Sequence, residues 1–226
     1  MKRLDLRLPV GPSSGGIVGL TKLNYPDKAV ASFFKPASQK PPDQLIWKIF
    51  KESLIMGRYE PSGAPSNVPQ DVNDSEDIRS IKIAAFDLDD TLITANSGNK
   101  WARHANSWKW WDGSVPARLK QLYSEGYLVI IMSNQGNVIP KAESKSLANL
   151  KACISSVLRQ LDLPIHFYAA TIQDRYRKPR TGMWEKLLDD LQLYGAVDMD
   201  NSFYVGDAGG REKTETRPKD HSNCDR

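Results

Sequence analysis

The sequence has few cysteines and no long apolar run, and both features exclude classes of protein. The only two cysteines among its 226 residues, Cys153 and Cys224, lie far apart and outside any C-x-x-C spacing. Neither a disulfide framework nor a zinc site is therefore indicated. The chain also lacks an apolar run of about 18 residues and the charged, apolar and small-residue order of a secretory signal. We expect an intracellular, soluble protein without a membrane partner.

The sequence also lacks an internal repeat and a G-x-x-x-x-G-K-[ST] loop, so it offers no nucleotide-phosphate cradle. Its formal net charge is +4 and its isoelectric point is near 8.9. This mild excess of positive charge suits a polyanionic partner, but it is far below the charge density of a dedicated nucleic-acid binder. Charge alone therefore does not choose between these functions.

The N-terminal part of the chain differs in composition from the rest. Residues 1–43 are rich in proline, glycine and serine and are predicted to form a disordered tail. Residues 44–80 are expected to be a docking segment and a linker, because Gln44 to Tyr59 carries enough apolar surface to dock as a strand or as a helix. A catalytic domain is expected over residues 81–226.

From Ile81 onward, apolar strand patterns alternate with amphipathic helix patterns. The expected strands are Ile81 to Phe86, Tyr127 to Met132, Ile165 to Ala170 and Phe203 to Val205, and the expected helices are Val115 to Glu125, Leu147 to Leu161 and Met183 to Leu193. Gly126 stands where a left-handed helix C-cap belongs. The order predicts an α/β fold with a parallel sheet, in which ligands bind at the carboxyl ends of the strands.

Four tryptophans lie between the first expected strand and its helix. They are Trp101, Trp108, Trp110 and Trp111. Their alternating spacing favours packing against the core over stacking on nucleic-acid bases.

The segment Asp87-Leu88-Asp89-Asp90-Thr91 follows the first expected strand directly. If the extended conformation continues, the carboxylates of Asp87 and Asp89 point to the same side and repel each other. A cation relieves this repulsion, and hard oxygen ligands of this kind suit Mg²⁺, which also accepts phosphate oxygens. One carboxylate can then attack a phosphoryl group while the other protonates the leaving oxygen. The alternative is an ordinary solvated acidic loop.

Polar residues also follow the other three expected strands. Ser133 and Asn134 offer a hydroxyl and an amide, Lys178 can neutralise a transferring phosphoryl group, and Asp207 can supply a further carboxylate to the same cation. Each of these alone is compatible with an ordinary turn or a solvated surface loop. Together at four strand ends, they predict a magnesium-dependent phosphatase site.

These motifs, in this order, resemble the haloacid-dehalogenase-like hydrolases. The surrounding residues are similar to the 3′-phosphatase domain of the polynucleotide kinase/phosphatase family, in its fungal form without a forkhead-associated domain. The similar segments are Ala84 to Asp89, Thr91 to Ile93, Trp108 to Trp111, Ser133 to Gly136, Arg177 to Trp184, Phe203 to Ala208 and the D-x-S-x-x-D stretch of Asp220, Ser222 and Asp225. The resemblance runs from about Gln44 to the end of the chain.

The resemblance implies a function and a role for each site residue. Asp87 would be the nucleophile, Asp89 the general acid and base, and Asp87, Asp89 (through its backbone carbonyl) and Asp207 would bind Mg²⁺. The phosphate-binding residues would be Thr91, Ser133, Asn134 and Lys178, with Thr91 also keeping Asp89 in position. The implied substrate is a 3′-phosphate at a DNA strand break, the implied location is the nucleus, and the tail would bind DNA-repair proteins.

The sequence departs from the family pattern in three places. Asp90 stands where glycine is usual, and Gly209 stands where alanine is usual. The chain ends at Arg226, where family members continue, so we expect an exposed sheet edge, an incomplete core and low stability. Two alternatives therefore stay open: a phosphatase of the same superfamily that acts on a small metabolite, and a truncated, non-catalytic interaction module.

Overall fold

The computed structural model describes residues 44–62, 80–96, 104–209, 215 and 225. All of them belong to one of the chain's two compact units, which covers residues 32–226. The expected disordered tail, residues 1–43, and most of the expected linker lie outside the described residues. In the described part of the chain, no helix has both the length and the apolar character needed to cross a membrane.

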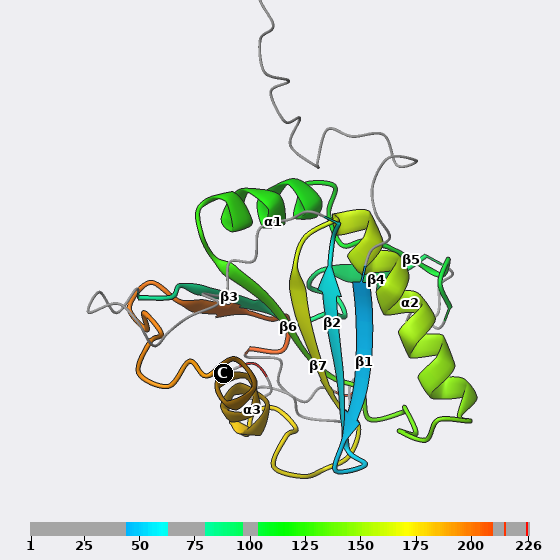
Figure 1. Ribbon diagram of the computed structural model, residues 1–226. Helices are drawn as coiled ribbons and strands as arrows, with labels where there is room; N and C mark the ends of the chain where they lie inside the picture. Colours follow the sequence, from blue (N-terminus) through cyan, green and yellow to red (C-terminus); the bar gives the residue numbers. More distant parts are fainter. Residues whose placement is uncertain (1–43, 63–79, 97–103, 210–214, 216–224, 226) are drawn as a thin grey trace, which may run out of the picture. The chain divides into compact units, whose positions relative to one another are not determined.

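A six-stranded sheet forms the centre of the fold (Figure 1), and its strand order is β1-β2-β7-β6-β3-β8. Four of these strands are parallel neighbours: β3 (Ile83–Phe86), β6 (Leu128–Asn134), β7 (Ile165–Ala170) and β8 (Phe203–Val205). They are the four strands that the sequence predicts, so the predicted α/β fold with a parallel sheet is confirmed for residues 81 onward. β3 and β7 are buried along their whole length, as expected for apolar runs that form inner strands of a parallel sheet.

The segment from Gln44 to Tyr59, which the sequence leaves open between strand and helix, is a β-hairpin. Its strands β1 (Gln44–Phe50) and β2 (Leu54–Glu60) pair with each other in antiparallel fashion. β2 also pairs in antiparallel fashion with β7. The hairpin therefore extends the parallel sheet into a mixed one and places its turn beside the carboxyl end of β7.

Helices cover both faces of the sheet (Figure 1). α1 (Val115–Ser124) and α2 (Lys145–Leu161) pack their apolar residues into one core, and α3 (Gly182–Leu191) packs into a second core on the other face. α2 buries residues at the three- and four-residue spacing of one helix face: Leu147, Leu150, Cys153, Ile154, Val157, Leu158 and Leu161. Gly126 follows α1 with φ +85°, which confirms the predicted left-handed cap.

A small two-stranded sheet, β4 (Ile93–Ala95) with β5 (Trp108–Trp110), lies between β3 and α1 in the sequence. The rings of Trp108 and Trp110 contact each other at 4.8 Å and pack against the core, which confirms the predicted packing for these two residues. Trp111 is 60% exposed, so the prediction is wrong for this side chain. Trp101 lies outside the described residues.

β8 is the last strand on its side of the sheet in the described part of the chain. Its residues Phe203 and Val205 are 37% and 43% exposed. The ring of Phe203 still contacts Phe86 of the neighbouring strand at 6.1 Å, so the strand is anchored on its inner side. The expectation of an exposed sheet edge stays a prediction, because most residues after Gly209 lie outside the described part of the chain.

Candidate active site

The site forms where four neighbouring parallel strands end, as expected for an open α/β sheet. Asp87 directly follows β3, Ser133 lies near the end of β6, Lys178 comes from the loop after β7, and Asp207 follows β8. The backbone N–H of Asp87 donates to the carbonyl of Val205 at 2.8 Å, which extends the β3–β8 pairing to the first site residue. Parallel pairing therefore brings these loops together.

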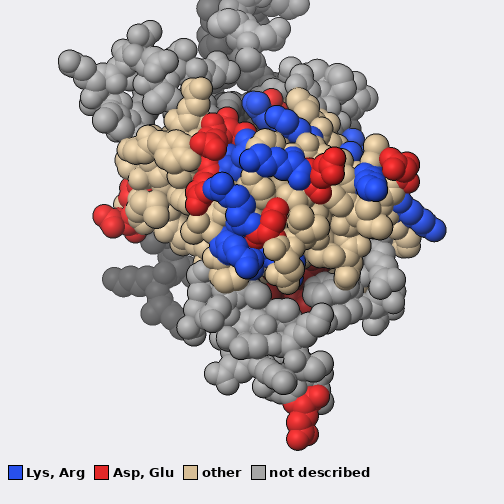
Figure 2. Space-filling model, turned by 90° about the horizontal axis from the view of Figure 1, so that it is seen from below, with Lys and Arg blue, Asp and Glu red and all other residues tan. Residues whose placement is uncertain are grey.

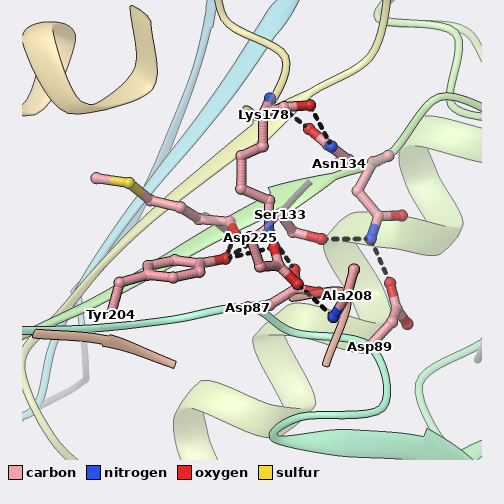
Figure 3. Close-up of polar contacts among 10 residues, drawn as sticks. Asp87, Asp89, Ser133, Asn134, Lys178, Tyr204, Ala208 and Asp225 are labelled. Carbon is pink, nitrogen blue, oxygen red and sulfur yellow. Dashed lines mark hydrogen bonds and ion pairs between the residues drawn. The ribbon is translucent and has the colours of Figure 1, made fainter. Parts of the chain in front are cut away.

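Asp87 and Lys178 form the centre of the site (Figure 3). Nζ of Lys178 lies 2.9 Å from Oδ1 of Asp87 and 2.7 Å from Oδ1 of Asp225. The three side chains are nearly buried, with 10% of Lys178, 12% of Asp87 and 1% of Asp225 exposed. The lysine therefore neutralises two buried carboxylates at once, which offsets much of the cost of removing them from water.

Asp225 is a member of the site to which the sequence analysis assigns no role. Its Oδ2 accepts a hydrogen bond from the backbone N–H of Ala208 at 2.7 Å, and its carboxylate lies against Gly206, where an added Cβ would be 2.4 Å away. The sequence feature that points to Asp225 is its place in the D-x-S-x-x-D stretch. No strand or helix pattern surrounds it, so the sequence alone does not place its carboxylate beside Asp87.

Tyr204 also joins the site without having been predicted. Its hydroxyl accepts a hydrogen bond from Nζ of Lys178 and donates one to Oδ1 of Asp225 at 3.1 Å. The residue lies in β8 with a half-buried ring, and Figure 3 shows its hydroxyl directed toward Lys178 and Asp225. Tyr204 therefore helps to hold the lysine between the two carboxylates.

Three carboxylates are close enough to hold a metal ion together. One oxygen each of Asp87, Asp207 and Asp225 lies within 4.8 Å of the other two. A donor set of oxygens alone suits a hard cation such as Mg²⁺, so these residues fit the implied cofactor. Two of the predicted ligands, Asp87 and Asp207, belong to this group, and Asp225 is an additional member. The predicted binding of the ion by the backbone carbonyl of Asp89 stays a prediction.

Asp89 is held by a glutamine. Nε2 of Gln135 donates to Oδ2 of Asp89 at 2.6 Å and to Oγ of Ser133 at 2.9 Å, so a single amide links the two predicted site residues. Burial, together with the negative charge of Asp87, raises the pKa of Asp89 to about 7. A carboxyl group with such a pKa can both donate and accept a proton near neutral pH.

The chain turns sharply after Asp89. Asp90 has φ +58°, in the left-handed region that glycine adopts most easily, which gives a physical reason for the glycine that is usual in the family. Oδ1 of Asp90 accepts a hydrogen bond from the hydroxyl of Thr94 at 3.3 Å. The aspartate is therefore tolerated in this turn, and its charge adds to the raised pKa of Asp89.

Thr91 has a buried hydroxyl with no hydrogen-bond partner in the described part of the chain. The expectation that Thr91 keeps Asp89 in position is therefore wrong, because the side chain of Gln135 holds that carboxylate. A buried hydroxyl without a partner is costly unless a ligand supplies one. The predicted contact of Thr91 with phosphate stays a prediction.

Asn134 fixes the loop that carries Lys178. Its Nδ2 donates to the backbone carbonyl of Lys178 at 3.1 Å, and its Oδ1 accepts from the backbone N–H of the same residue at 3.0 Å. This two-point contact fixes the backbone position of Lys178. The predicted binding of phosphate by Asn134 stays a prediction, as does that of Ser133, whose side chain is buried beside Gln135.

The charges within the site oppose one another. Burial raises the pKa of Asp87, the positive charge of Lys178 opposes this rise, and the charge of Asp225 adds to it. For Asp225, burial alone would raise the pKa, but the charge of Lys178 and the hydrogen bonds from Lys178 and Ala208 lower it. Asp225 therefore stays ionised more readily than Asp87, because its pKa is lowered and that of Asp87 is raised.

The chain is similar to known proteins over this region. A family model described as polynucleotide kinase 3 phosphatase matches residues 82–226. A bifunctional polynucleotide phosphatase/kinase of Schizosaccharomyces pombe is 41% identical over 144 residues, which cover 64% of this chain and 33% of that protein. The polynucleotide 3′-phosphatase ZDP of Arabidopsis thaliana is 32% identical over 192 residues, covering 79% of this chain and 24% of that protein. The chain spans about a third and about a quarter of these two relatives.

Two further likenesses concern a viral relative and the fold. An uncharacterized 20.8 kDa protein of Autographa californica nuclear polyhedrosis virus is 35% identical over 147 residues, covering 64% of this chain and 76% of that protein. The crystal structure of a protein described as a haloacid-dehalogenase-like phosphatase, from Mesorhizobium loti, matches with a TM-score of 0.52 at 15% identity, covering 70% of this chain and 72% of that one. This second likeness concerns the fold alone. The family model matches more than half of the chain, so this chain belongs to the polynucleotide kinase 3 phosphatase family, a family of phosphatases, and has the haloacid-dehalogenase-like α/β fold.

Proposed function

We propose that the chain is a DNA 3′-phosphatase that removes 3′-phosphate from strand-break ends in DNA repair. The observation that carries the proposal is the nearly buried Asp87, held by Lys178 at 2.9 Å at the end of β3. A carboxylate fixed beside a cation can act as the nucleophile toward a phosphoryl group, because the same cation neutralises charge on the phosphoryl oxygens. The names of the fission yeast and Arabidopsis relatives support the choice of substrate.

The proposed reaction has two steps. A carboxylate oxygen of Asp87 attacks phosphorus, the bond between phosphorus and the 3′ oxygen breaks, and the departing oxygen keeps the electron pair and takes a proton from Asp89. Water then attacks the phosphorus of the aspartyl-phosphate, gives its proton to Asp89, and releases inorganic phosphate with the carboxylate of Asp87 restored. Gln135 holds Asp89 for both proton transfers.

Mg²⁺ is the proposed cofactor, held by Asp87, Asp207 and Asp225. When bound, the ion would neutralise part of the negative charge of the carboxylates and of the phosphoryl group. Lys178 would neutralise part of the same negative charge, because its ammonium group already contacts two of the three carboxylates. Thr91 would supply to the phosphate its hydroxyl, which has no hydrogen-bond partner among the described residues.

Positive charge around the site supports a polyanionic substrate. Lys51 at the hairpin turn and Arg175 and Arg180 in the loop that carries Lys178 are exposed, and Arg175 forms an ion pair with Glu185. Seen from below, the molecule bears several groups of Lys and Arg side chains with Asp and Glu among them (Figure 2). Such a surface can attract a phosphate backbone without binding it tightly. Nuclear location, and recruitment of repair proteins by residues 1–43, are part of this proposal and rest on the family resemblance.

A comparison of substrates tests the proposal. The chain is assayed with Mg²⁺ on a 3′-phosphorylated oligonucleotide, the matching 5′-phosphorylated oligonucleotide and p-nitrophenyl phosphate, with Asp87→Asn as the inactive control. We expect kcat/KM for the 3′-phosphate to exceed the other two by orders of magnitude and to vanish in the variant. Equal or better turnover of the small phosphomonoester would instead support a metabolite phosphatase. Absence of turnover on all three substrates would support a non-catalytic module.

A further inference from the structure

The turn of the β1–β2 hairpin packs against the loop that carries Lys178. The rings of Phe50, the last residue of β1, and Tyr176 meet edge to face at 6.0 Å and an interplanar angle of 76°. Tyr176 is 5% exposed and lies two residues before Lys178 in the chain. An aromatic contact of this edge-to-face geometry stabilises the packing beyond the burial of its surface. The hairpin therefore restrains the middle of the loop.

Hydrogen bonds restrain the start of the same loop. The carbonyl of Ser53, in the hairpin turn, accepts from the hydroxyl of Thr171 at 2.7 Å and from its backbone N–H at 2.9 Å. Thr171 is the first residue after β7, and it is buried. The turn itself needs left-handed backbone at two residues, Lys51 and Glu52, so its shape is closely defined.

A third contact joins the turn to the helix that follows the loop. Nζ of Lys186, in α3, lies 4.8 Å from the centre of the Phe50 ring. The hairpin thus contacts the beginning of the loop, its middle and the element after it. On the opposite side, Asn134 holds the backbone of Lys178. The lysine is therefore fixed from two sides, by β6 and by the hairpin.

We propose that the hairpin turn is a positioning element for Lys178, and that Phe50 is a positioning residue that acts through Tyr176. The proposal rests on the proposed function in one respect, namely that Lys178 contacts the phosphoryl group. The hairpin precedes residue 82, where the match to the family model begins. A segment outside that matched region thus contributes to the phosphate-binding geometry.

The physical reason is the steep dependence of catalysis on position. A displacement of about 1 Å of a group that stabilises the transferring phosphoryl group costs up to about 100-fold in rate. Without the Phe50 ring, Tyr176 loses its edge-to-face partner. The backbone pairing of β1 with β2 and of β2 with β7 can still form in the same register. The loop then has fewer restraints on the hairpin side, and Nζ of Lys178 samples more positions.

The experiment compares two aromatic residues of the same strand. Phe50→Ala removes the contact with the loop, and Trp47→Ala removes a contact of nearly identical geometry, 6.0 Å and 78°, with Phe167 in the body of β7. Phe50→Tyr retains the ring and serves as the conservative variant. For each variant in the full chain with Mg²⁺, we measure kcat and KM on p-nitrophenyl phosphate and on the 3′-phosphorylated oligonucleotide, the inhibition constant of inorganic phosphate, and Tm.

We expect Phe50→Ala to lower kcat/KM about 10-fold or more and to weaken inhibition by inorganic phosphate by a similar factor. Trp47→Ala should lower Tm yet leave both values within about twofold per folded molecule, and Phe50→Tyr should resemble the parent chain. Equal effects of Phe50→Ala and Trp47→Ala, or unchanged phosphate inhibition in Phe50→Ala, would overturn the inference. If Phe50→Ala does not fold, Phe50→Leu, which keeps apolar bulk without a ring, takes its place with the same expectations.

The outcomes also separate this inference from the proposed function. A loss in Phe50→Ala on p-nitrophenyl phosphate without any preference for DNA would support the positioning role and reject the DNA substrate. If the parent chain has no turnover, binding of inorganic phosphate is followed by ³¹P NMR in the presence of Mg²⁺. Weaker binding in Phe50→Ala than in Trp47→Ala would support the inference, and absence of binding by the parent chain would overturn it.

Discussion

Nζ of Lys178 lies 2.9 Å from Oδ1 of Asp87, although the two residues come from loops that follow different strands, β7 and β3. The same ammonium group is 2.7 Å from Asp225, so one cation serves two nearly buried carboxylates. This relationship makes Lys178 important for stability as well as for chemistry, because removing it leaves two buried negative charges side by side.

The first prediction concerns that lysine. Lys178→Met should destabilise the chain by roughly 3 kcal/mol in EDTA, since a buried ion pair that loses one partner leaves an uncompensated charge. Mg²⁺ should then raise the Tm of the variant more than that of the parent chain, because the ion replaces the missing cation between Asp87 and Asp225. Thermal unfolding with and without Mg²⁺ measures both effects.

Arg58→Met is the control for this prediction, because Arg58 forms an exposed ion pair with Glu60 and should matter little to stability. A Lys178→Met variant as stable as Arg58→Met in EDTA would contradict the expected role of the lysine.

The second prediction concerns the glutamine between Asp89 and Ser133. Gln135→Leu should lower kcat about 10-fold on a 3′-phosphorylated oligonucleotide, because Asp89 loses the hydrogen bond that orients it as proton donor. The loss should be smaller on p-nitrophenyl phosphate, whose leaving group departs without needing a proton. Steady-state kinetics on both substrates measures the difference.

Gln121→Leu is the matched control for Gln135→Leu. It removes a similar hydrogen bond from a glutamine to a carboxylate, Glu125, on the exposed surface of α1. This variant should keep parental rates on both substrates. Equal losses on the two substrates in Gln135→Leu would argue against a role in orienting the proton donor.

The third prediction compares two glycines in the turn after β8. Gly206→Ala places a Cβ 2.4 Å from the carboxylate of Asp225, so it should destabilise the chain by about 1–3 kcal/mol and reduce turnover. Gly209→Ala meets no atom of the described residues within 4 Å and should stabilise the chain by about 0.4–1 kcal/mol through the unfolded state. Tm and turnover of both variants test this contrast, and similar behaviour of the pair would refute it.

The fourth prediction concerns pH and stability. Burial lowers the pKa of His166 from 6.5 to about 4, with Arg58 adding to the effect and Glu60 and Asp190 opposing it. The neutral side chain therefore stabilises the fold fully above pH 6.5, and this contribution is lost as the pH falls toward 4, because the unfolded chain binds the proton first. Between pH 7 and pH 5 the loss should be about 2 kcal/mol.

His166→Gln removes this titration, so the difference between the free energies of unfolding of parent and variant should change by that amount over the same pH range. Urea unfolding at several pH values measures it, with the exposed His104→Gln as a control. A parent and a His166→Gln variant with the same pH dependence would show that His166 does not titrate in this way.

The sequence by itself determined the order of the parallel strands along the chain, the three helices and the polar residues that follow each strand. Short apolar runs flanked by helical patterns, such as Ile165–Ala170, are typical of buried parallel strands, and Asp87, Lys178 and Asp207 lie in the segments that follow such runs. Since the carboxyl ends of neighbouring parallel strands share one edge of the sheet, local patterns were enough to predict that these residues meet.

Only the tertiary structure decided the contacts that depend on pairing between distant segments. The hairpin of residues 44–60 joins β7 through backbone hydrogen bonds, which the apolar pattern of its sequence does not specify. The carboxylate of Asp225 lies near that of Asp87 although the sequence around Asp225 has no strand or helix pattern. Gln135 rather than Thr91 holds Asp89 because of how the β6 loop meets the β3 turn. Side-chain partners are chosen by the three-dimensional packing of loops, and neither helical nor strand periodicity carries that information.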